Sequence, residues 1–185
     1  MRKISSRRMV LIAIMTALSI AGRFIPMFKP VTAVTIITGA YLGGGSGFLV
    51  GALSAFLSNF YFGQGPWTPF QMLAWGSIGI VAGLLSKPIK NSRMFIMIFG
   101  VLSGIAYSLA MDIWTVLWYA KGFEWSLYGV AIITAIPHTV LYSISNLIFL
   151  FIMAKPFGEK LERIKIKYFY SAQGKFEQNR IFIKS

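Results

Sequence analysis

The sequence contains no cysteine, a single histidine and only five acidic residues among 185. Without cysteine the chain can form no disulfide, no thiolate nucleophile and no thiolate metal site. One histidine also offers too few ligands for a transition-metal site. Charged residues make up 12% of the chain, against about 25% in soluble domains, so the composition indicates a membrane protein.

Long apolar runs take up most of the chain, which is 56% hydrophobic with a mean hydropathy of +0.68. About 20 apolar residues cross a bilayer core as a helix, and continuous rather than alternating runs indicate helices rather than a barrel. We expect an all-α integral membrane protein with a retained first helix rather than a cleaved signal peptide. The six transmembrane helices are expected at about residues 8–25, 31–42, 47–62, 70–86, 94–119 and 126–154. They would form one membrane domain, 1–155, followed by a basic tail, 156–185.

Lysine and arginine are distributed unevenly between the two sides of this arrangement. With six spans both termini share one side, and that side collects fifteen of the 18 basic residues. The opposite side has only Arg23, Lys29 and Lys121. The positive-inside rule therefore places both termini in the cytoplasm of a multi-pass cell-membrane protein. The net charge of +13 is explained by topology and by attraction to anionic lipid headgroups, not by nucleic acid.

Residues 62–71 read FGQGPWTPFQ and form an uncharged loop on the expected outer side. Gly63 and Gly65 permit tight backbone geometry, while two prolines restrict it. The loop thereby presents Trp67 together with the amides of Gln64 and Gln71. A wall or lid over an organic ligand needs such apolar faces with a few placed polar groups.

Asp112 is the only acid within a span, and His138 is the only histidine. Ionisable groups in the membrane are costly and suggest function, although both side chains could instead hold the last two helices together. Interfacial aromatic residues such as Tyr61 and Trp114 could likewise belong to a membrane belt. The candidate substrate-binding residues are Tyr61, Gln64, Trp67, Gln71, Asp112, Trp114 and His138.

No catalytic signature such as H-E-x-x-H, G-x-S-x-G, Walker A or a helical carboxylate pair is present. Residues 44–47, GGSG, match G-x-S-G, which resembles the nucleophile motif of rhomboid intramembrane proteases. An intramembrane serine protease using Ser46 and His138 is therefore one alternative. It is disfavoured because Ser46 is expected at the cytoplasmic side while His138 is approached from outside.

Small residues recur at a spacing of four on the first helix, where Ala13 and Ala17 give a smooth stripe. Together with the block GAYLGGGSGFLVGALSAFLSNFYFGQGPWTPFQMLAWG, this stripe resembles the S components of energy-coupling factor (ECF) transporters over about residues 8–155. The resemblance implies a subunit that captures a vitamin from outside and topples to release it inward. It implies contact of Ala13 and Ala17 with a transmembrane coupling subunit. Two cytoplasmic ATPases would hold ATP and magnesium, so this chain would be no enzyme and would bind no cofactor.

The vitamin is less well defined by the sequence. The block from Gly65 to Gln71 looks most like S components for cobalamin and cobinamide, and uncharged aromatics and amides suit a large neutral ligand or a cationic ring. Another vitamin of the pyridoxine, pantothenate or queuosine-precursor type stays open. An autonomous small transporter, which would usually dimerise, is a further alternative.

Overall fold

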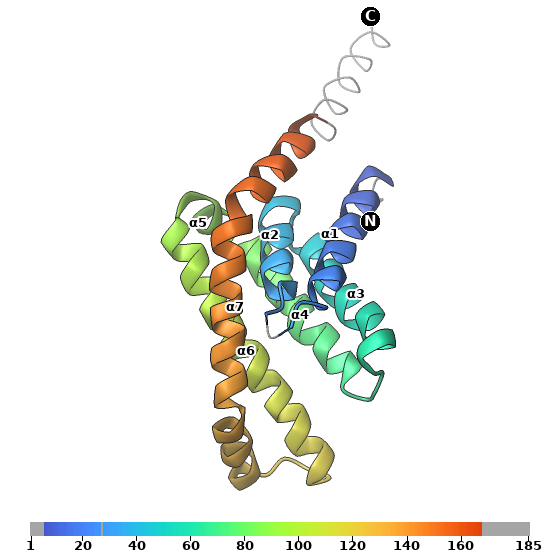
Figure 1. The fold of residues 1–185 in the computed structure, drawn as a ribbon, viewed down its shortest axis with the longest axis vertical. Helices are drawn as coiled ribbons and strands as arrows, with labels where there is room; N and C mark the ends of the chain where they lie inside the picture. The colour runs from blue at the N-terminus through green and yellow to red at the C-terminus, as the bar shows by residue number, and fades with distance from the viewer. Residues whose placement is uncertain (1–5, 27, 168–185) are drawn as a thin grey trace, which may run out of the picture.

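The computed structural model describes residues 6–26 and 28–167, and within these ranges every regular element is a helix. Successive helices run back and forth between the two ends of the molecule. The beginning of the first helix and the end of the last helix lie toward the same end (Figure 1). The helices are α1 (Ser6–Gly22), α2 (Val31–Leu42), α3 (Gly44–Phe62), α4 (Thr68–Leu84), α5 (Ser86–Asn91), α6 (Arg93–Tyr119) and α7 (Trp125–Lys165).

Each of the six apolar segments expected from the sequence forms a helix, but α1 ends at Gly22 rather than at the expected residue 25, and residues 23–25 form a turn. Two further differences lie at the polar connections. The expected connector after residue 86 contains the short helix α5, and α7 continues past Ala154 to Lys165 through Pro156. The first part of the expected tail is therefore helical, while residues 168–185 lie outside the described part of the chain. Three helices, α3, α6 and α7, are long and apolar enough to cross a membrane, and α2 and α4 are apolar but shorter.

Local sequence signals set several helix ends. Gly43, with φ of 95°, separates α2 from α3, and Gly63, with φ of 107°, ends α3. These left-handed conformations favour glycine because other residues carry a Cβ atom. Pro69 lies in the first turn of α4, where its missing N–H costs nothing. Ser92 caps α6, because its hydroxyl accepts a hydrogen bond from the Phe95 N–H at 3.2 Å.

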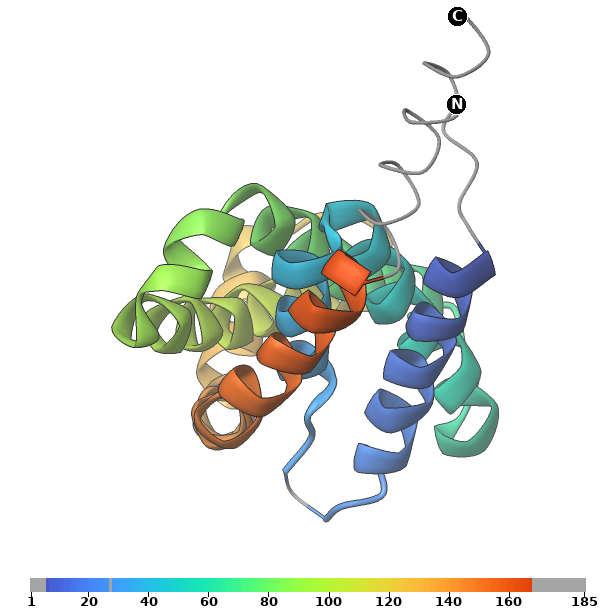
Figure 2. The ribbon, with the colours of Figure 1, turned by 90° about the horizontal axis from the view of Figure 1, so that it is seen from above.

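Helix α2 lies at the centre of the molecule and contacts each of the other helices. Residues 31–40 are buried without interruption, so all faces of this helix are covered by protein. A helix that is apolar all round is suited to such a position. Figure 2 shows α1 at the edge of this arrangement, on the opposite side from α5 and the beginning of α6.

The longest helices, α6 and α7, form an antiparallel pair that extends beyond the others (Figure 1). Asn146 of α7 donates to the carbonyl oxygen of Gly100 of α6 at 2.9 Å, and the hydroxyls of Ser108 and Thr139 are 2.6 Å apart. These bonds link the two helices along their shared length. Their distal ends are exposed at Tyr119 and Trp125.

Candidate functional site

A buried arginine stands where α1 ends. Arg23 is only 8% exposed, and its guanidinium Nη1 donates to Ser58 Oγ and, at 3.1 Å, to Asn59 Oδ1 of α3. The turn after Gly22 therefore folds the arginine inward against α3. The sequence placed Arg23 only among the basic residues of the expected outer side, so its burial is a finding of the structure.

Hydrogen bonds extend from Arg23 through α3 and α4 to α6. The Asn59 amide donates to Thr68 Oγ1 at 2.9 Å and to Gln71 Oε1 at 2.8 Å. Thr68 in turn donates to Gln64 Oε1 at 2.9 Å, and Gln71 Nε2 donates to the Tyr107 hydroxyl at 3.1 Å. We refer to this connected set as the Arg23 network, and its members are Arg23, Ser58, Asn59, Gln64, Thr68, Gln71 and Tyr107.

Aromatic rings surround the network. Trp75 of α4 stacks on Tyr107 with ring centroids 4.6 Å apart and an interplanar angle of 9°, and Tyr142 meets Tyr107 edge-on at 5.4 Å. The Arg23 guanidinium carbon lies 4.9 Å from the Phe62 ring and 5.4 Å from the Trp75 ring. Cation–π contacts of this kind strengthen when water is excluded. The site therefore combines flat apolar faces with hydrogen-bonding groups.

Within the described residues, no carboxylate forms an ion pair with Arg23, and its buried Nε–H has no hydrogen-bond partner. Buried charges are usually paired, because desolvation is costly. A second cation, Lys29, lies on the α1–α2 loop. Burial, and secondarily the charge of Arg23, lower the pKa of the Lys29 ammonium below its usual value. The site thus has positive charge and an unused donor, which suits a ligand that brings acceptor oxygens.

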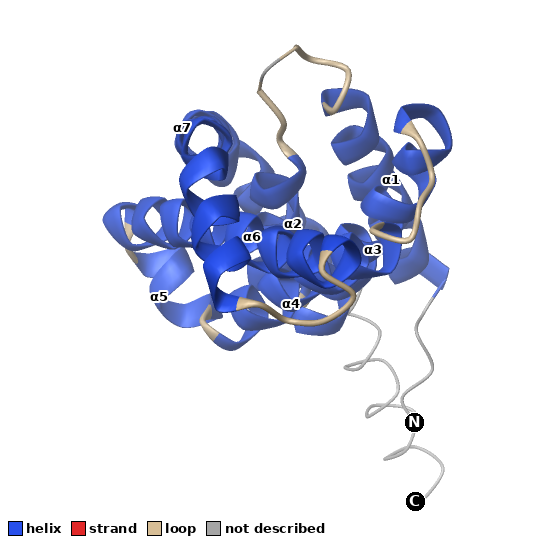
Figure 3. Cartoon of the chain, turned by 90° about the horizontal axis from the view of Figure 1, so that it is seen from below, coloured by secondary structure: helices blue, strands red, loops and turns tan. Residues whose placement is uncertain are grey.

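The loop after Arg23 is fastened to α7. The Lys29 N–H donates to Ser145 Oγ at 2.8 Å, and the Ser145 hydroxyl donates back to the Lys29 carbonyl oxygen at 3.0 Å. Figure 3 shows the α1–α2 connection standing away from the helices before it returns to α2. The α2 end of this loop is therefore held against α7 by two hydrogen bonds.

Four of the expected binding residues lie in or beside the Arg23 network. Gln64 and Gln71 are members of it. Tyr61 is exposed, and its ring centroid lies 4.7 Å from that of Phe24, the residue after Arg23. Trp67 is 38% exposed at the start of α4, where its ring lies against the backbone of Gly65.

The other three expected binding residues belong to α6 and α7. Trp114 packs against Phe70 of α4, with ring centroids 4.7 Å apart. Asp112 is buried on α6, and its carboxyl makes no hydrogen bond or ion pair with a described residue. His138 is exposed on α7, beside Pro137. Hydrogen bonds do not join any of these three to the network.

Residues from several elements complete the site, and sequence reasoning did not select them. Ser58, Asn59, Trp75 and Tyr107 were not among the candidates, yet they hold the arginine or the stacked rings. The sequence did contain one signal for these residues. Ser58 and Asn59 follow Ser54 by four and five residues, so polar groups recur on one face of an otherwise apolar helix. Which side chain they bind depends on the turn after α1, which no local pattern predicts.

Two further sequence candidates have clear positions. The Ala13 and Ala17 side chains are exposed on α1, on a face that also presents Val10 and Ile14. Ser46 is buried at the start of α3, where its hydroxyl accepts from Arg8 Nε at 2.8 Å and donates to the Leu42 carbonyl oxygen at 3.3 Å. These bonds give Ser46 a structural role at the α2–α3 junction.

Comparison with known protein families gives a match over most of the chain. Residues 3–162 match the family model described as ECF-type riboflavin transporter, S component. No curated protein and no solved structure matches the chain. The matched range includes every helix up to the last turn of α7. The expectation of an ECF S component is confirmed, and the chain belongs to the ECF-type riboflavin transporter S component family.

Proposed function

We propose that the chain captures riboflavin, or a flavin closely related to it, outside the cell and passes it inward as part of an ECF transporter. The description of the matched family names riboflavin as the transported vitamin. It lends no support to the cobalamin or cobinamide expectation, which we do not retain. A coupling subunit and two ATPases would supply the energy, so the chain itself would carry out no catalysis and hold no cofactor.

The proposed topology has six spans, α1 to α4, α6 and α7, with both termini in the cytoplasm. The unequal distribution of lysine and arginine, fifteen against three, supports this orientation. Helix α2 has 12 residues and is about 18 Å long, shorter than a bilayer core of about 30 Å. The length of α2 need not match the thickness of the bilayer core, because the other helices and not lipid surround it. The Arg23 network then faces outward, away from the termini.

The Arg23 network is the observation that carries the ligand assignment. Riboflavin has a flat three-ring system that is uncharged at neutral pH, with two carbonyl oxygens at one edge and a chain of hydroxyls. Arg23 has a buried, unused Nε–H donor and no carboxylate partner among the described residues. The ring carbonyls would accept from this cation, while aromatic faces such as Trp67 and Tyr61 would cover the rings. The side-chain amides of Gln64 and Gln71 would form hydrogen bonds with the hydroxyl groups of riboflavin.

Binding to the purified full-length chain in detergent tests the proposal. Riboflavin is titrated by calorimetry and by loss of its own fluorescence, and cobalamin, cobinamide, pyridoxine and pantothenate are titrated in parallel. We expect one riboflavin per chain and no comparable binding of the others. If a different vitamin binds tightly in the same preparation, the flavin assignment is wrong while the family assignment stands.

Co-purification distinguishes an S component from an autonomous transporter. We expect the chain to bring down a coupling subunit and two ATPases when all are expressed together. A chain that transports riboflavin in vesicles without these partners would instead be the autonomous transporter considered from the sequence.

A further inference from the structure

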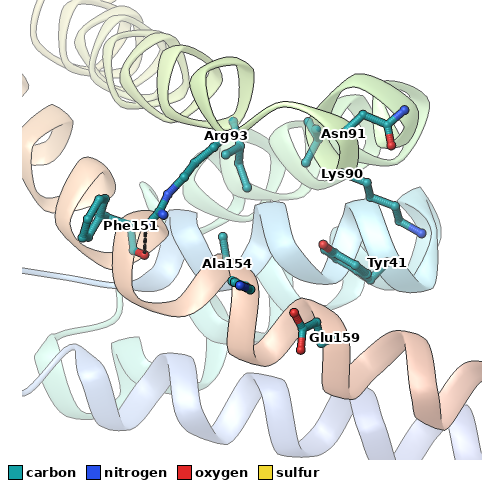
Figure 4. Close-up of a pocket in the computed structure, with 10 residues that line it drawn as sticks. Tyr41, Lys90, Asn91, Arg93, Phe151, Ala154 and Glu159 are labelled. Carbon is teal, nitrogen blue, oxygen red and sulfur yellow. Dashed lines mark hydrogen bonds between the residues drawn. The ribbon is translucent and has the colours of Figure 1, made fainter.

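A cavity of about 380 Å³ is lined by residues of α2, α5, α6 and α7. These parts of the helices lie toward the end of the molecule where α1 begins (Figure 1), away from the Arg23 network. Figure 4 shows the cavity with its lining side chains coming from α2, from the α5–α6 region and from α7. Its polar lining consists of Tyr41, Lys90, Asn91, Arg93, Lys155 and Glu159. Neither the sequence candidates nor the vitamin site uses any of these residues.

The three cations of this cavity differ in how they are neutralised. Lys90 is paired, because its Nζ is 2.7 Å from a Glu162 carboxylate oxygen. The Arg93 guanidinium has no acidic partner among the described residues and donates only to the Phe151 carbonyl oxygen, at 3.2 Å. Lys155 forms no hydrogen bond or ion pair with any described residue. Two cations at the cavity are therefore available to an anion.

One acid, Glu159, also lines the cavity and limits how much negative charge the cavity can accept. Its carboxylate oxygen lies 3.8 Å from Arg163 Nη2 on the exposed surface of α7, so this acid is itself paired with a cation outside the cavity. Counting Glu162 as well, three cations face two carboxylates, so the site retains positive charge. Tyr41 and Asn91 add neutral groups that can donate hydrogen bonds to an oxyanion.

An exposed apolar stripe begins at the rim of the cavity. Phe151 lines the cavity and is 58% exposed, with the Arg93 guanidinium carbon 4.2 Å from its ring. Ile148 and Ile144 precede it by three and seven residues on α7 and are also exposed. Residues at this spacing share one helix face. The stripe therefore leads from the cationic cavity along α7 toward the membrane interior, as an acyl chain would run.

We propose that this cavity binds the phosphate of an anionic phospholipid in the cytoplasmic leaflet, with an acyl chain along Phe151, Ile148 and Ile144. Basic pockets between transmembrane helices on the cytoplasmic side have the chemistry to hold such headgroups. The apolar stripe favours a lipid over a free phosphate compound, because only the lipid covers both surfaces. The site depends on the proposed orientation of the chain and not on the identity of the vitamin.

Native mass spectrometry of the full-length chain in detergent tests the site with short-chain phosphatidylglycerol, phosphatidylcholine and glycerol phosphate as probes. We expect one phosphatidylglycerol to be retained preferentially. The double variant Arg93→Gln with Lys155→Gln is expected to bind it about tenfold more weakly. The charge-matched control, Lys87→Gln with Lys160→Gln, alters two exposed lysines outside the cavity and is expected to change the affinity less than about twofold.

Several outcomes would overturn the site. If both double variants lose affinity for phosphatidylglycerol equally, the lipid is bound by general surface charge and not by this cavity. If phosphatidylcholine is retained as well as phosphatidylglycerol, the cavity does not select an anionic headgroup. Competition by glycerol phosphate as effective as by the lipid would assign the cavity to a soluble phosphate compound. If the double variant does not fold, Lys155→Gln alone decides, because Lys155 has no partner whose loss could unfold the chain. That variant is expected to bind the lipid about threefold more weakly.

Discussion

At the scale of single residues, Arg23 is the least expected side chain of the fold. Burying a guanidinium without a carboxylate costs free energy, and hydrogen bonds to Ser58 and Asn59 together with aromatic contacts recover only part of it. Because Arg23 also has an unused Nε–H donor, we propose that it binds the ligand. Binding affinity and stability of the unliganded chain should therefore respond to its replacement in opposite directions.

Replacing Arg23 by Gln should weaken riboflavin binding about ten- to a hundredfold, because a hydrogen bond from a charged group contributes about 1.5–3 kcal/mol. The melting temperature of the unliganded variant should stay the same or rise, since the desolvation cost of the charge is gone. Calorimetry and thermal melting in detergent measure the two effects. Lys121→Gln, an exposed position in the α6–α7 loop, serves as the charge control. Unchanged affinity in the Arg23 variant would remove the arginine from the site.

Trp67 allows a separate test of the 62–71 loop as the wall of the ligand site. The ring is partly exposed and rests on Gly65, so Trp67→Ala should leave the melting temperature nearly unchanged. Loss of an aromatic face against a flat ligand should weaken binding about three- to tenfold. Trp118→Ala, an exposed indole far along α6, is the matched control. An equal effect of the two replacements would indicate a general property of interfacial tryptophans.

At the scale of helices, glycines set the distances between α2, α3 and α4. A Cβ atom at Gly79 of α4 would lie 2.3 Å from the carbonyl carbon of Gly47 of α3, and one at Gly47 would lie 2.7 Å from Gly39 Cα of α2. Three backbones therefore meet where no side chain fits, as small residues allow in membrane helices. This crossing makes α2, α3 and α4 one packed unit beneath the Arg23 network.

Gly79→Ala should destabilise this unit, because the added methyl group meets backbone atoms that cannot move aside independently. Overpacking of this kind typically costs about 1–3 kcal/mol, so we expect a clear fall in melting temperature in detergent. Gly45→Ala is a close control, since Gly45 is helical and a Cβ atom there meets nothing within 4 Å. That variant should melt at or above the original temperature. Equal melting of the two variants would contradict the packing described.

The sequence predicted the positions of the helices better than the site. Apolar runs located α2 to the residue and α3, α4 and α6 to within a few residues, because burial and membrane contact both require apolar side chains. Residues 87–93 were expected as a connector and the last helix was expected to end at Ala154, because the lysines and Pro156 interrupt the apolar pattern there. The structure instead has helix α5 up to Asn91 and continues α7 to Lys165. Polar segments next to a membrane carry little periodic signal, so tertiary contacts decide their structure.

Among the members of the Arg23 network, the sequence selected Gln64 and Gln71 through the unusual composition of one loop. It did not select Arg23 or Tyr107, because the side-chain hydrogen-bond partners of these two residues lie 35 or more residues away in the chain. A local pattern can show that a loop is stiff and polar, as prolines and glycines do between 62 and 71. A local pattern cannot show that Arg23, from the turn after α1, packs next to this loop.

At the scale of the whole molecule, α1 has one face packed against protein and one open face. It contacts α2 and α3, lies at the edge of the arrangement (Figure 2), and leaves Ala13 and Ala17 exposed. A smooth surface of small side chains allows another helix to approach closely. This outer face of α1 is therefore the surface on which we expect the coupling subunit.

Ala17→Leu tests that surface in the assembled transporter. A leucine side chain would hold an approaching helix away from the α1 backbone, so less coupling subunit should co-purify with the variant, by about fivefold or more for a loss of roughly 1 kcal/mol. Riboflavin binding by the isolated chain should be unchanged, because Ala17 is exposed on the outer face of α1, away from the Arg23 network. Ala106→Leu makes the same change at an exposed position of α6 and should leave assembly intact. If both variants assemble equally well, the coupling subunit binds elsewhere. If Ala17→Leu loses riboflavin binding too, its effect is on folding and the α1 surface is not thereby identified.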